Sequence, residues 1–341
     1  MQNRRLRVLV TGASGFLGGN ILRVLQQHSD LHPVAACRDP GKLPAAYTGE
    51  VRVGDLRDAR YRHAVVQDID VVCHAGTWAA MWSYAEQEQE NFYNPTLDLI
   101  EQAMHAGCKR FLMTSTVVLP RPVKRGETLD DFATPEYTGH WPHLDRLVDI
   151  DRYMQTHADR GMQMVCMRLG HFIGVGNKLG LVPALVPRLK TYLVPWLAGG
   201  KSRLPLIADS DLAEAFVLAI MADDLNPYES FNICGNDFPA TRNVIDYIAA
   251  KTGTSSPFYS VPYKAGYLFG WLMETLFPIL PGKGPFLTRS IVHLAEDWYC
   301  TTNYAEQKLG FKAKKSWQTA LDEALDELKQ HDYPWLYLSQ Q

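Results

Sequence analysis

Residues 8–18 read Val-Leu-Val-Thr-Gly-Ala-Ser-Gly-Phe-Leu-Gly, and this stretch decides the fold class. An apolar run leads into glycines at positions 12, 15 and 18, and apolar residues then recur at helical spacing. A strand, a glycine turn and a helix in this order predict a turn that binds a dinucleotide. Gly12 permits the tight turn, Gly15 lets the backbone approach a pyrophosphate, and Gly18 lets the helix pack close to the strand.

The start of the helix after this turn adds to the predicted phosphate site. Its unpaired N–H groups and the positive end of its dipole both favour an anion. The residues that we expect to contact the cofactor here are Gly12, Ser14, Gly15, Phe16, Leu17 and Gly18.

Length, charge and cysteine content bound the class of protein. A chain of 341 residues suggests a large α/β domain with a smaller lobe, and a net charge of −3 gives no reason to expect nucleic-acid binding. The N-terminus is basic but lacks the apolar core of a signal peptide, and the six cysteines form no Cys-x-x-Cys pair. We therefore expect a cytoplasmic protein with reduced thiols and no metal site.

Apolar runs and helix-period segments alternate through the first half of the chain. The expected strands are 7–10, 33–37, 51–53, 71–74, 111–114 and 164–168. The expected helices between them are 19–27, 60–66, 92–106 and 144–157. This alternation predicts a doubly wound parallel sheet, a Rossmann fold, with the carboxyl end of every strand on one edge.

The composition changes after residue 170, and Gly and Pro become dense through 174–205. This change predicts a second unit. We expect a dinucleotide-binding domain of residues 1–170, to which 205–235 returns, and a substrate lobe of 171–204 and 236–341. Further expected elements are the strands 204–208 and 231–234 and the helices 212–221 and 317–328.

The residues after the second strand discriminate between NADP and NAD. Arg38 offers a planar fork that suits a 2′-phosphate, and Lys42 follows shortly after it. We therefore expect NADP. In the alternative, Arg38 is solvated and Asp39 accepts hydrogen bonds from the ribose of NAD.

Other strand ends carry small or polar residues that a ligand at the sheet edge would meet. Asp55 can accept from an adenine amino group or cap the next helix, and the small residues after His74 let the backbone lie against the cofactor. The three hydroxyls at 114–116 are costly to bury without partners, so they suit a site that orients a substrate oxygen. The further cofactor contacts that we expect are Asp55, Leu56, His74, Ala75, Gly76, Thr114, Leu169 and His171.

These elements together resemble the extended short-chain dehydrogenase/reductase superfamily, the NAD-dependent epimerases and dehydratases, over essentially the whole chain. The tail is most similar to the 3β-hydroxysteroid dehydrogenase branch. The matching pieces are the glycine turn, 54–56, 74–76, Asn91, 114–116, 168–170 and 209–213, with Glu274, 285–289 and 308–311 in the tail. The resemblance implies a Rossmann fold, a bound nicotinamide dinucleotide and redox chemistry at a carbinol or ketone.

The resemblance also implies an acid/base pair that this sequence lacks at the expected place. The family has a Tyr and, four residues later on the same helix, a Lys that lowers the tyrosine pKa. Here the tyrosine slot falls at or near Trp141 and the lysine slot near Asp145 or Arg146. Tyr247 and Lys251 have the spacing but lie in the C-terminal lobe, so we treat them as a coincidence.

Three alternatives follow for the chemistry. Tyr137 reaches the site from a loop and acts without its Lys, or His140 or His143 supplies the proton, or the protein binds a dinucleotide without turnover. Thr116 fits the family position that holds the substrate oxygen. The candidate catalytic residues are Thr116, Tyr137 and His143.

Segment 265–280 carries a single charge, Glu274, and is rich in Leu, Phe, Trp and Tyr. It is shorter than the roughly 20 apolar residues that span a bilayer. We expect a helix that packs on the substrate lobe; in the alternative, the segment docks on a membrane or admits an apolar substrate. A homodimer is compatible with the sequence.

The leading hypothesis is an NADP-dependent oxidoreductase that acts on a fairly large apolar carbonyl or alcohol. The alternative from another class is a cofactor-binding protein that senses or scaffolds. An epimerase or dehydratase is a third, because one fold and one cofactor serve several reactions.

Overall fold

The computed structural model describes residues 4–124, 126–178, 180–277 and 284–330. A seven-stranded sheet forms its centre, in the order β10-β6-β5-β4-β1-β2-β3, and all neighbouring strands are parallel. These strands are β1 (Leu6–Thr11), β2 (Leu31–Cys37), β3 (Glu50–Val53), β4 (Val71–His74), β5 (Arg110–Thr116), β6 (Gln163–Leu169) and β10 (Tyr228–Ile233). The predicted doubly wound sheet is confirmed.

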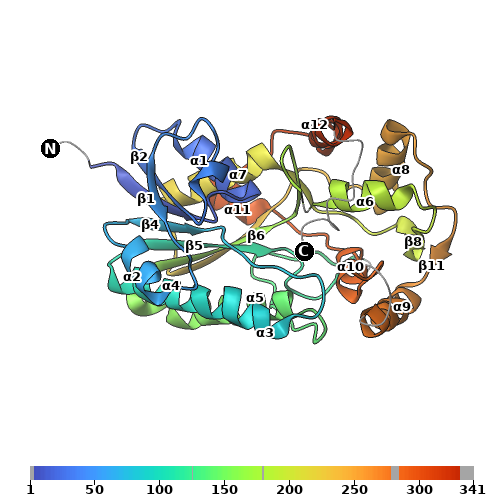
Figure 1. Ribbon diagram of the computed structural model, residues 1–341, viewed down its shortest axis with the longest axis horizontal. Coiled ribbons are helices and arrows are strands. Elements are labelled where there is room, and N and C mark those ends of the chain that lie inside the picture. The colour runs from blue at the N-terminus through green and yellow to red at the C-terminus, as the bar shows by residue number, and fades with distance from the viewer. Residues whose placement is uncertain (1–3, 125, 179, 278–283, 331–341) are drawn as a thin grey trace.

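Helices cover both faces of the sheet (Figure 1). The inner strands are nearly continuous apolar runs because both of their faces are buried, as at Val71, Val72 and Cys73 in β4. One face packs against α1 (Phe16–Leu25), α7 (Asp209–Met221) and α11 (Asn303–Leu309). The other packs against α2 (Ala59–Val65), α4 (Asn94–His105) and α5 (Pro142–His157), with the short α3 (Ala85–Glu88) beside α5.

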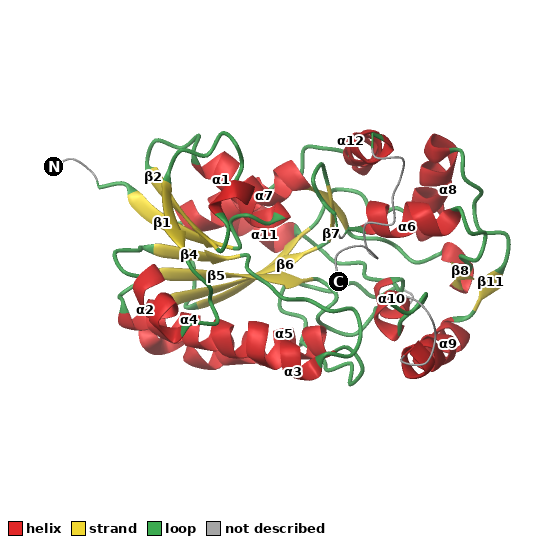
Figure 2. Ribbon diagram, viewed as in Figure 1, coloured by secondary structure: helices red, strands yellow, loops and turns green. Residues whose placement is uncertain are grey.

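A smaller lobe lies beyond the carboxyl edge of the sheet (Figure 2). Its core is shared by three helices, which contribute buried residues such as Val186, Ile248 and Leu321. These helices are α6 (Leu181–Leu189), α8 (Thr241–Thr252) and α12 (Trp317–Lys329). Two small parallel sheets pair β7 (His171–Ile173) with β9 (Leu206–Ala208), and β8 (Trp196–Leu197) with β11 (Ser260–Val261).

The chain crosses between the two units more than once. β10 completes the large sheet although it follows the first helix of the lobe. We therefore keep as a proposal the division into residues 1–170 with 205–235, and 171–204 with 236–341.

The predicted apolar segment forms α9 (Tyr263–Leu276), which packs on α10 (Arg289–Leu294). Gly270 permits the close approach, since a Cβ there would lie 2.9 Å from the Arg289 nitrogen. Positions 278–280 of the segment lie outside the described residues. Within the described ranges, no helix is both long and apolar enough to cross a membrane.

Candidate functional site

The glycine turn after β1 leaves room for a ligand. Gly12 has a φ of +63°, and a Cβ there would lie 2.7 Å from the Cα of Gly76. A Cβ on Gly18 would overlap the Gly12 carbonyl, so the start of α1 can approach the strand only without a side chain. Gly15 is exposed, and the one heavy atom near its missing Cβ is the Gly12 oxygen, at 3.1 Å. The space above Gly15 and the uncapped start of α1 therefore fit a pyrophosphate.

The histidine at the end of β4 holds this turn together. His74 is 2 % exposed, and its ring nitrogens lie 2.8 Å from the Thr11 hydroxyl and 3.0 Å from the Thr96 hydroxyl. The Gly76 N–H donates to the same Thr11 oxygen. Burial lowers the pKa of His74 to about 4. The His74 side chain therefore stays neutral and fixes the backbone of Ala75 and Gly76 against Gly12, where Leu56 also lies near Gly76.

The ends of β2 and β3 place the residues predicted to meet the adenosine half. Arg38 is exposed and makes no hydrogen bond or ion pair within the described chain. Asp39 accepts from the Gly41 N–H at 3.0 Å and lies 3.7 Å from Lys42. Asp55 pairs with Arg57 at 2.7 Å, and this hydrogen bond lowers the pKa of the Asp55 carboxyl. Within the described chain, Arg38 thus has no ion-pair partner, although its charge also helps to lower the pKa of Asp55, whereas Asp39 already caps its own turn.

The ends of β5 and β6 supply polar atoms at the place where a nicotinamide would lie. Thr114 has a buried hydroxyl that has no partner in the described chain, and the Thr116 hydroxyl accepts from the Val118 N–H. His171 follows the buried Leu169, and its Nε2 is also buried without a partner. Burial lowers the pKa of His171 to about 4. Such unmet groups are costly unless a ligand completes them, so these residues fit the predicted cofactor.

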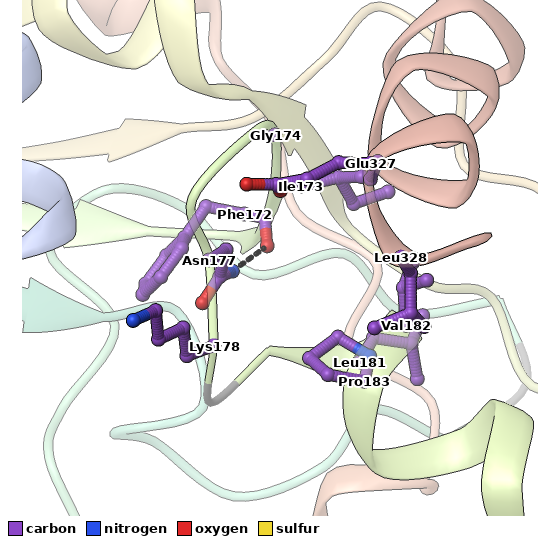
Figure 3. A pocket seen from close by; sticks show the side chains of 11 residues that line it. Phe172, Ile173, Gly174, Asn177, Lys178, Leu181, Val182, Pro183, Glu327 and Leu328 are labelled. Atoms are coloured by element: carbon purple, nitrogen blue, oxygen red, sulfur yellow. Dashed lines mark hydrogen bonds between the residues drawn. The ribbon is translucent and has the colours of Figure 1, made fainter. Parts of the chain in front are cut away.

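A cavity of about 150 Å³ adjoins this end of the site (Figure 3). Its wall includes Phe172, whose ring stacks at 5.5 Å on Phe16 of the glycine turn. Asn177 donates to the Phe172 carbonyl at 3.0 Å, and Glu327 of α12 accepts from the Gly176 N–H at 2.6 Å. The loop after β7 is therefore tied to the lobe on one side and to the dinucleotide turn on the other.

The two slots of the family acid/base pair are occupied by residues with other partners. Trp141 is buried, and its indole N–H donates to the Ala80 carbonyl at 2.9 Å. Asp145 accepts hydrogen bonds from the backbone N–H groups of Thr138 and Gly139, at 2.7 and 3.1 Å. The carboxylate in the lysine slot therefore closes the loop before α5.

Tyrosine–lysine pairs at the family spacing occur elsewhere in the chain with their hydroxyls engaged. Tyr247 donates to Asp322, which also pairs with Lys251. Tyr304 and Lys308 share the spacing, and the Tyr304 hydroxyl donates to Glu229. Both pairs thus have structural partners away from α5.

The candidate proton donors Tyr137 and His143 have different partners. The Tyr137 side chain is 50 % exposed, its hydroxyl donates to Asp149 at 2.5 Å, and this bond raises its pKa. His143 points its Nδ1 to the fully buried Glu88 at 3.2 Å, and Glu88 also accepts from the Ala80 N–H. The structure therefore engages both residues in contacts of the protein itself.

His140 lies in a group of residues that the sequence analysis did not bring together. Its ring is 6.1 Å from that of His293 on α10 and 5.6 Å from that of Tyr267 on α9. The Trp141 ring is 6.2 Å from His293. No local motif marks His293, because its neighbours come from distant parts of the chain.

The comparisons with known proteins identify the family of this chain. Residues 8–234 match the model of the NAD dependent epimerase/dehydratase family. The chain is 35 % identical over 349 residues to a "3 beta-hydroxysteroid dehydrogenase/Delta 5-->4-isomerase" of Mycobacterium tuberculosis. The alignment covers 94 % of this chain and 89 % of that protein. It is 24 % identical over 230 residues to a UDP-glucose 4-epimerase of Vibrio cholerae, covering 62 % of this chain and 66 % of the relative.

Solved structures of the same fold include epimerases with a bound dinucleotide. The UDP-glucuronic acid 4-epimerase from Bacillus cereus in complex with UDP-glucuronic acid and NAD has a TM-score of 0.73 at 17 % identity, covering 96 % of this chain and 100 % of that one. The UDP-glucose 4-epimerase of Thermus thermophilus in complex with NAD has a TM-score of 0.71 at 19 % identity, with 95 % and 99 % covered. These structural similarities show the fold. Family membership is shown by the family model together with the 35 % identical relative: the chain belongs to the NAD-dependent epimerase/dehydratase family of extended short-chain dehydrogenases/reductases.

Proposed function

We propose that this protein is an NADP-dependent oxidoreductase that acts on the hydroxyl or carbonyl group of a large apolar molecule. The observation that carries the proposal is the cradle of Gly12, Gly15 and Gly76, with the orphaned Thr114 hydroxyl at its far end. The relative named as a 3β-hydroxysteroid dehydrogenase supports an apolar alcohol as the substrate class. Six reduced cysteines suit a cytoplasmic protein.

The choice of NADP over NAD rests on the contrast between two neighbours. Arg38 is exposed and without an ion-pair partner in the described chain, so its guanidinium can meet a 2′-phosphate. Asp39 already accepts from the Gly41 N–H through Oδ1, which leaves Oδ2 for a ribose. We assign Lys42, which lies near Asp39, to the same phosphate region.

In the proposed reaction, the cofactor and the residues of this chain have separate roles. The dinucleotide, when bound, supplies the two-electron exchange with the substrate carbon. Thr116, at the end of β5, would orient the substrate oxygen through its hydroxyl. Tyr137 and His143 receive no role in this proposal: the Tyr137 hydroxyl donates to Asp149, and Nδ1 of His143 faces Glu88.

The outward face of α9 carries exposed apolar side chains that suit contact with a lipid surface. Leu268, Phe269, Trp271 and Leu272 are between 42 and 65 % exposed, and the buried positions of the helix are glycines. Aromatic and aliphatic side chains on one exposed face are typical of a helix that lies in a membrane interface. We propose that this face contacts a lipid surface, while a homodimer stays a prediction of the sequence.

This contact has a direct test. The protein should float with liposomes in low salt and be released by carbonate. A Leu268→Ser, Trp271→Ser variant should remain unbound, and flotation equal to wild type would overturn the contact.

A second candidate function is dinucleotide binding without turnover. The observation that favours it is the pair of Trp141 and Asp145 in the slots of the family Tyr and Lys. One experiment separates the two candidates. NADPH and NADP⁺ are titrated by calorimetry, and turnover is then followed by absorbance with the 3β-hydroxysteroid pregnenolone and a panel of apolar ketones. Binding with turnover supports the oxidoreductase, and binding without turnover on the whole panel supports the second candidate.

A further inference from the structure

A partly buried polar cluster lies between α9, α10 and the loop before α5. It consists of His140, Tyr267, His293 and Glu296, with Trp141 beside it. His293 is 6 % exposed, and its Nε2 has no hydrogen-bond partner in the described chain. A buried polar atom without a partner costs about 1–3 kcal/mol, so a ligand that supplied the partner would be favoured.

Three of these residues form a chain of contacts. The Tyr267 hydroxyl donates to a Glu296 carboxylate oxygen at 2.6 Å, and the same hydroxyl lies 3.3 Å from Nδ1 of His293. Because the Tyr267 proton points to Glu296, the Tyr267 oxygen offers a lone pair to an N–H at Nδ1. With the Tyr267 proton directed to Glu296, this arrangement favours the tautomer of His293 that carries a lone pair on Nε2. The Val118 backbone also interacts with the His293 ring.

The position of α10 brings this ring to the edge of the sheet. Ser290 of α10 donates to the Met81 carbonyl in the loop that follows β4. The Val118 backbone, two residues beyond Thr116, lies beside the His293 ring, and the backbone of Leu294 lies beside His171. α10 thus sits over the ends of β4, β5 and β6, next to the predicted substrate-oxygen residue.

We propose that Nε2 of His293 exchanges the substrate proton in place of the missing tyrosine, with Tyr267 and Glu296 as its positioning residues. This proposal rests on the proposed oxidoreductase function. In the oxidation, the C–H bond of the carbinol breaks and its electron pair leaves as hydride for the dinucleotide. The O–H bond breaks, its proton goes to Nε2, and the C–O single bond becomes double. Reduction reverses each of these steps.

The surroundings of His293 set its protonation state. His140 faces it from the loop before α5, Tyr267 from α9 and Glu296 from the segment after α10, while Arg289, at the start of α10, is paired with Glu274. Burial and then the neighbouring His140 lower the pKa of His293 to about 4. The ring is therefore neutral at pH 7. In the proposed step, the Glu296 carboxylate, which the ring reaches through Tyr267, would offset the charge of the imidazolium.

The test compares His293→Asn with wild type and with His157→Asn, a control at the far end of α5. Asn keeps a donor for Tyr267 but removes Nε2. Single-turnover oxidation of pregnenolone should slow by about a hundredfold or more in His293→Asn, with NADPH affinity by calorimetry within about twofold of wild type. Tyr267→Phe and Glu296→Gln should shift the pH profile of the rate. A rate and pH profile of His293→Asn equal to wild type would overturn the proposal.

A second readout does not depend on turnover. Long-range ¹H–¹⁵N spectra, assigned by the signals lost in His293→Asn, should show a protonated Nδ1 and a bare Nε2 at pH 7. A protonated Nε2 with a bare Nδ1 would overturn the proposed role of His293. If wild type binds NADPH but turns over none of the panel, the oxidoreductase function fails, and this inference fails with it. If the enzyme is active but Nε2 of His293 carries the proton, the proposed role of His293 fails and the oxidoreductase function stands.

Discussion

Asp145 accepts a hydrogen bond from the backbone N–H of Thr138 at 2.7 Å, at the position where the family places its lysine. The same carboxylate bonds the Thr138 hydroxyl and the Gly139 N–H. A lysine has no acceptor to offer these groups, so the loop before α5 is built around a carboxylate. The departure from the family pattern is therefore structural as well as chemical.

Asp145→Ala should lower the free energy of unfolding by about 1–3 kcal/mol, because it leaves backbone donors without their acceptor. Urea denaturation measures this loss. Asp159→Ala, at an exposed position after α5, is the control and should change stability by less than about 0.5 kcal/mol. Equal stabilities of the two variants would show that the Asp145 bonds contribute nothing to the loop.

Tyr137→Phe should leave kcat/KM within about twofold of wild type, since the exposed hydroxyl serves Asp149 and the ring lies under Arg152. Steady-state kinetics with NADP⁺ and a 3β-hydroxysteroid measure this. A loss of about a hundredfold would instead identify Tyr137 as the general acid/base.

Arg38→Ala should weaken NADPH by about ten- to a hundredfold and leave NADH nearly unchanged, because only NADPH has a phosphate for the guanidinium fork. Calorimetry with both cofactors measures the two affinities. Equal changes for both would make Arg38 a structural residue and remove the reason to prefer NADP.

Acid should destabilise the fold through its buried neutral histidines. The pKa of His74 and that of His293 fall from 6.5 to about 4 on folding. The stability that these neutral rings contribute is fully present above pH 6.5 and is lost as the pH falls toward 4, by about 1.4 kcal/mol per pH unit for each ring. Thermal unfolding between pH 7 and pH 4.5 should show this decline, with a smaller slope in His74→Asn. Identical slopes would mean that His74 titrates alike in both states.

The sequence predicted the elements with the strongest local signals. The strand expected at 71–74 is β4, and the glycine turn lies between β1 and α1 as expected. The sequence predicted no helix where α6 lies, because Pro183 and Pro187 are unusual inside a helix. Pro183 stands in the first turn, where Pro is tolerated, and packing in the lobe core stabilises the rest.

In the candidate site, too, the sequence predicted the residues of a local motif and missed those that only the fold brings together. The residues of the glycine turn follow one another in the sequence, so their spacing alone could mark them. His293 meets His140, Trp141 and Tyr267 only because α9 and α10 fold back over the sheet edge. Neither periodicity nor a motif carries that information.

We propose that a dinucleotide lies across the glycine turn, and a Gly15→Val variant probes this position. The backbone of Gly15 is in the ordinary extended region, and Val fills the space over the start of α1, with its Cβ at a tight 3.1 Å from the Gly12 oxygen. Gly19→Ala is the matched control, since its Cβ would meet Pro44 at an ordinary 3.4 Å. Calorimetric titration with NADPH should show binding to wild type and Gly19→Ala and none to folded Gly15→Val. Full affinity in Gly15→Val would contradict the account.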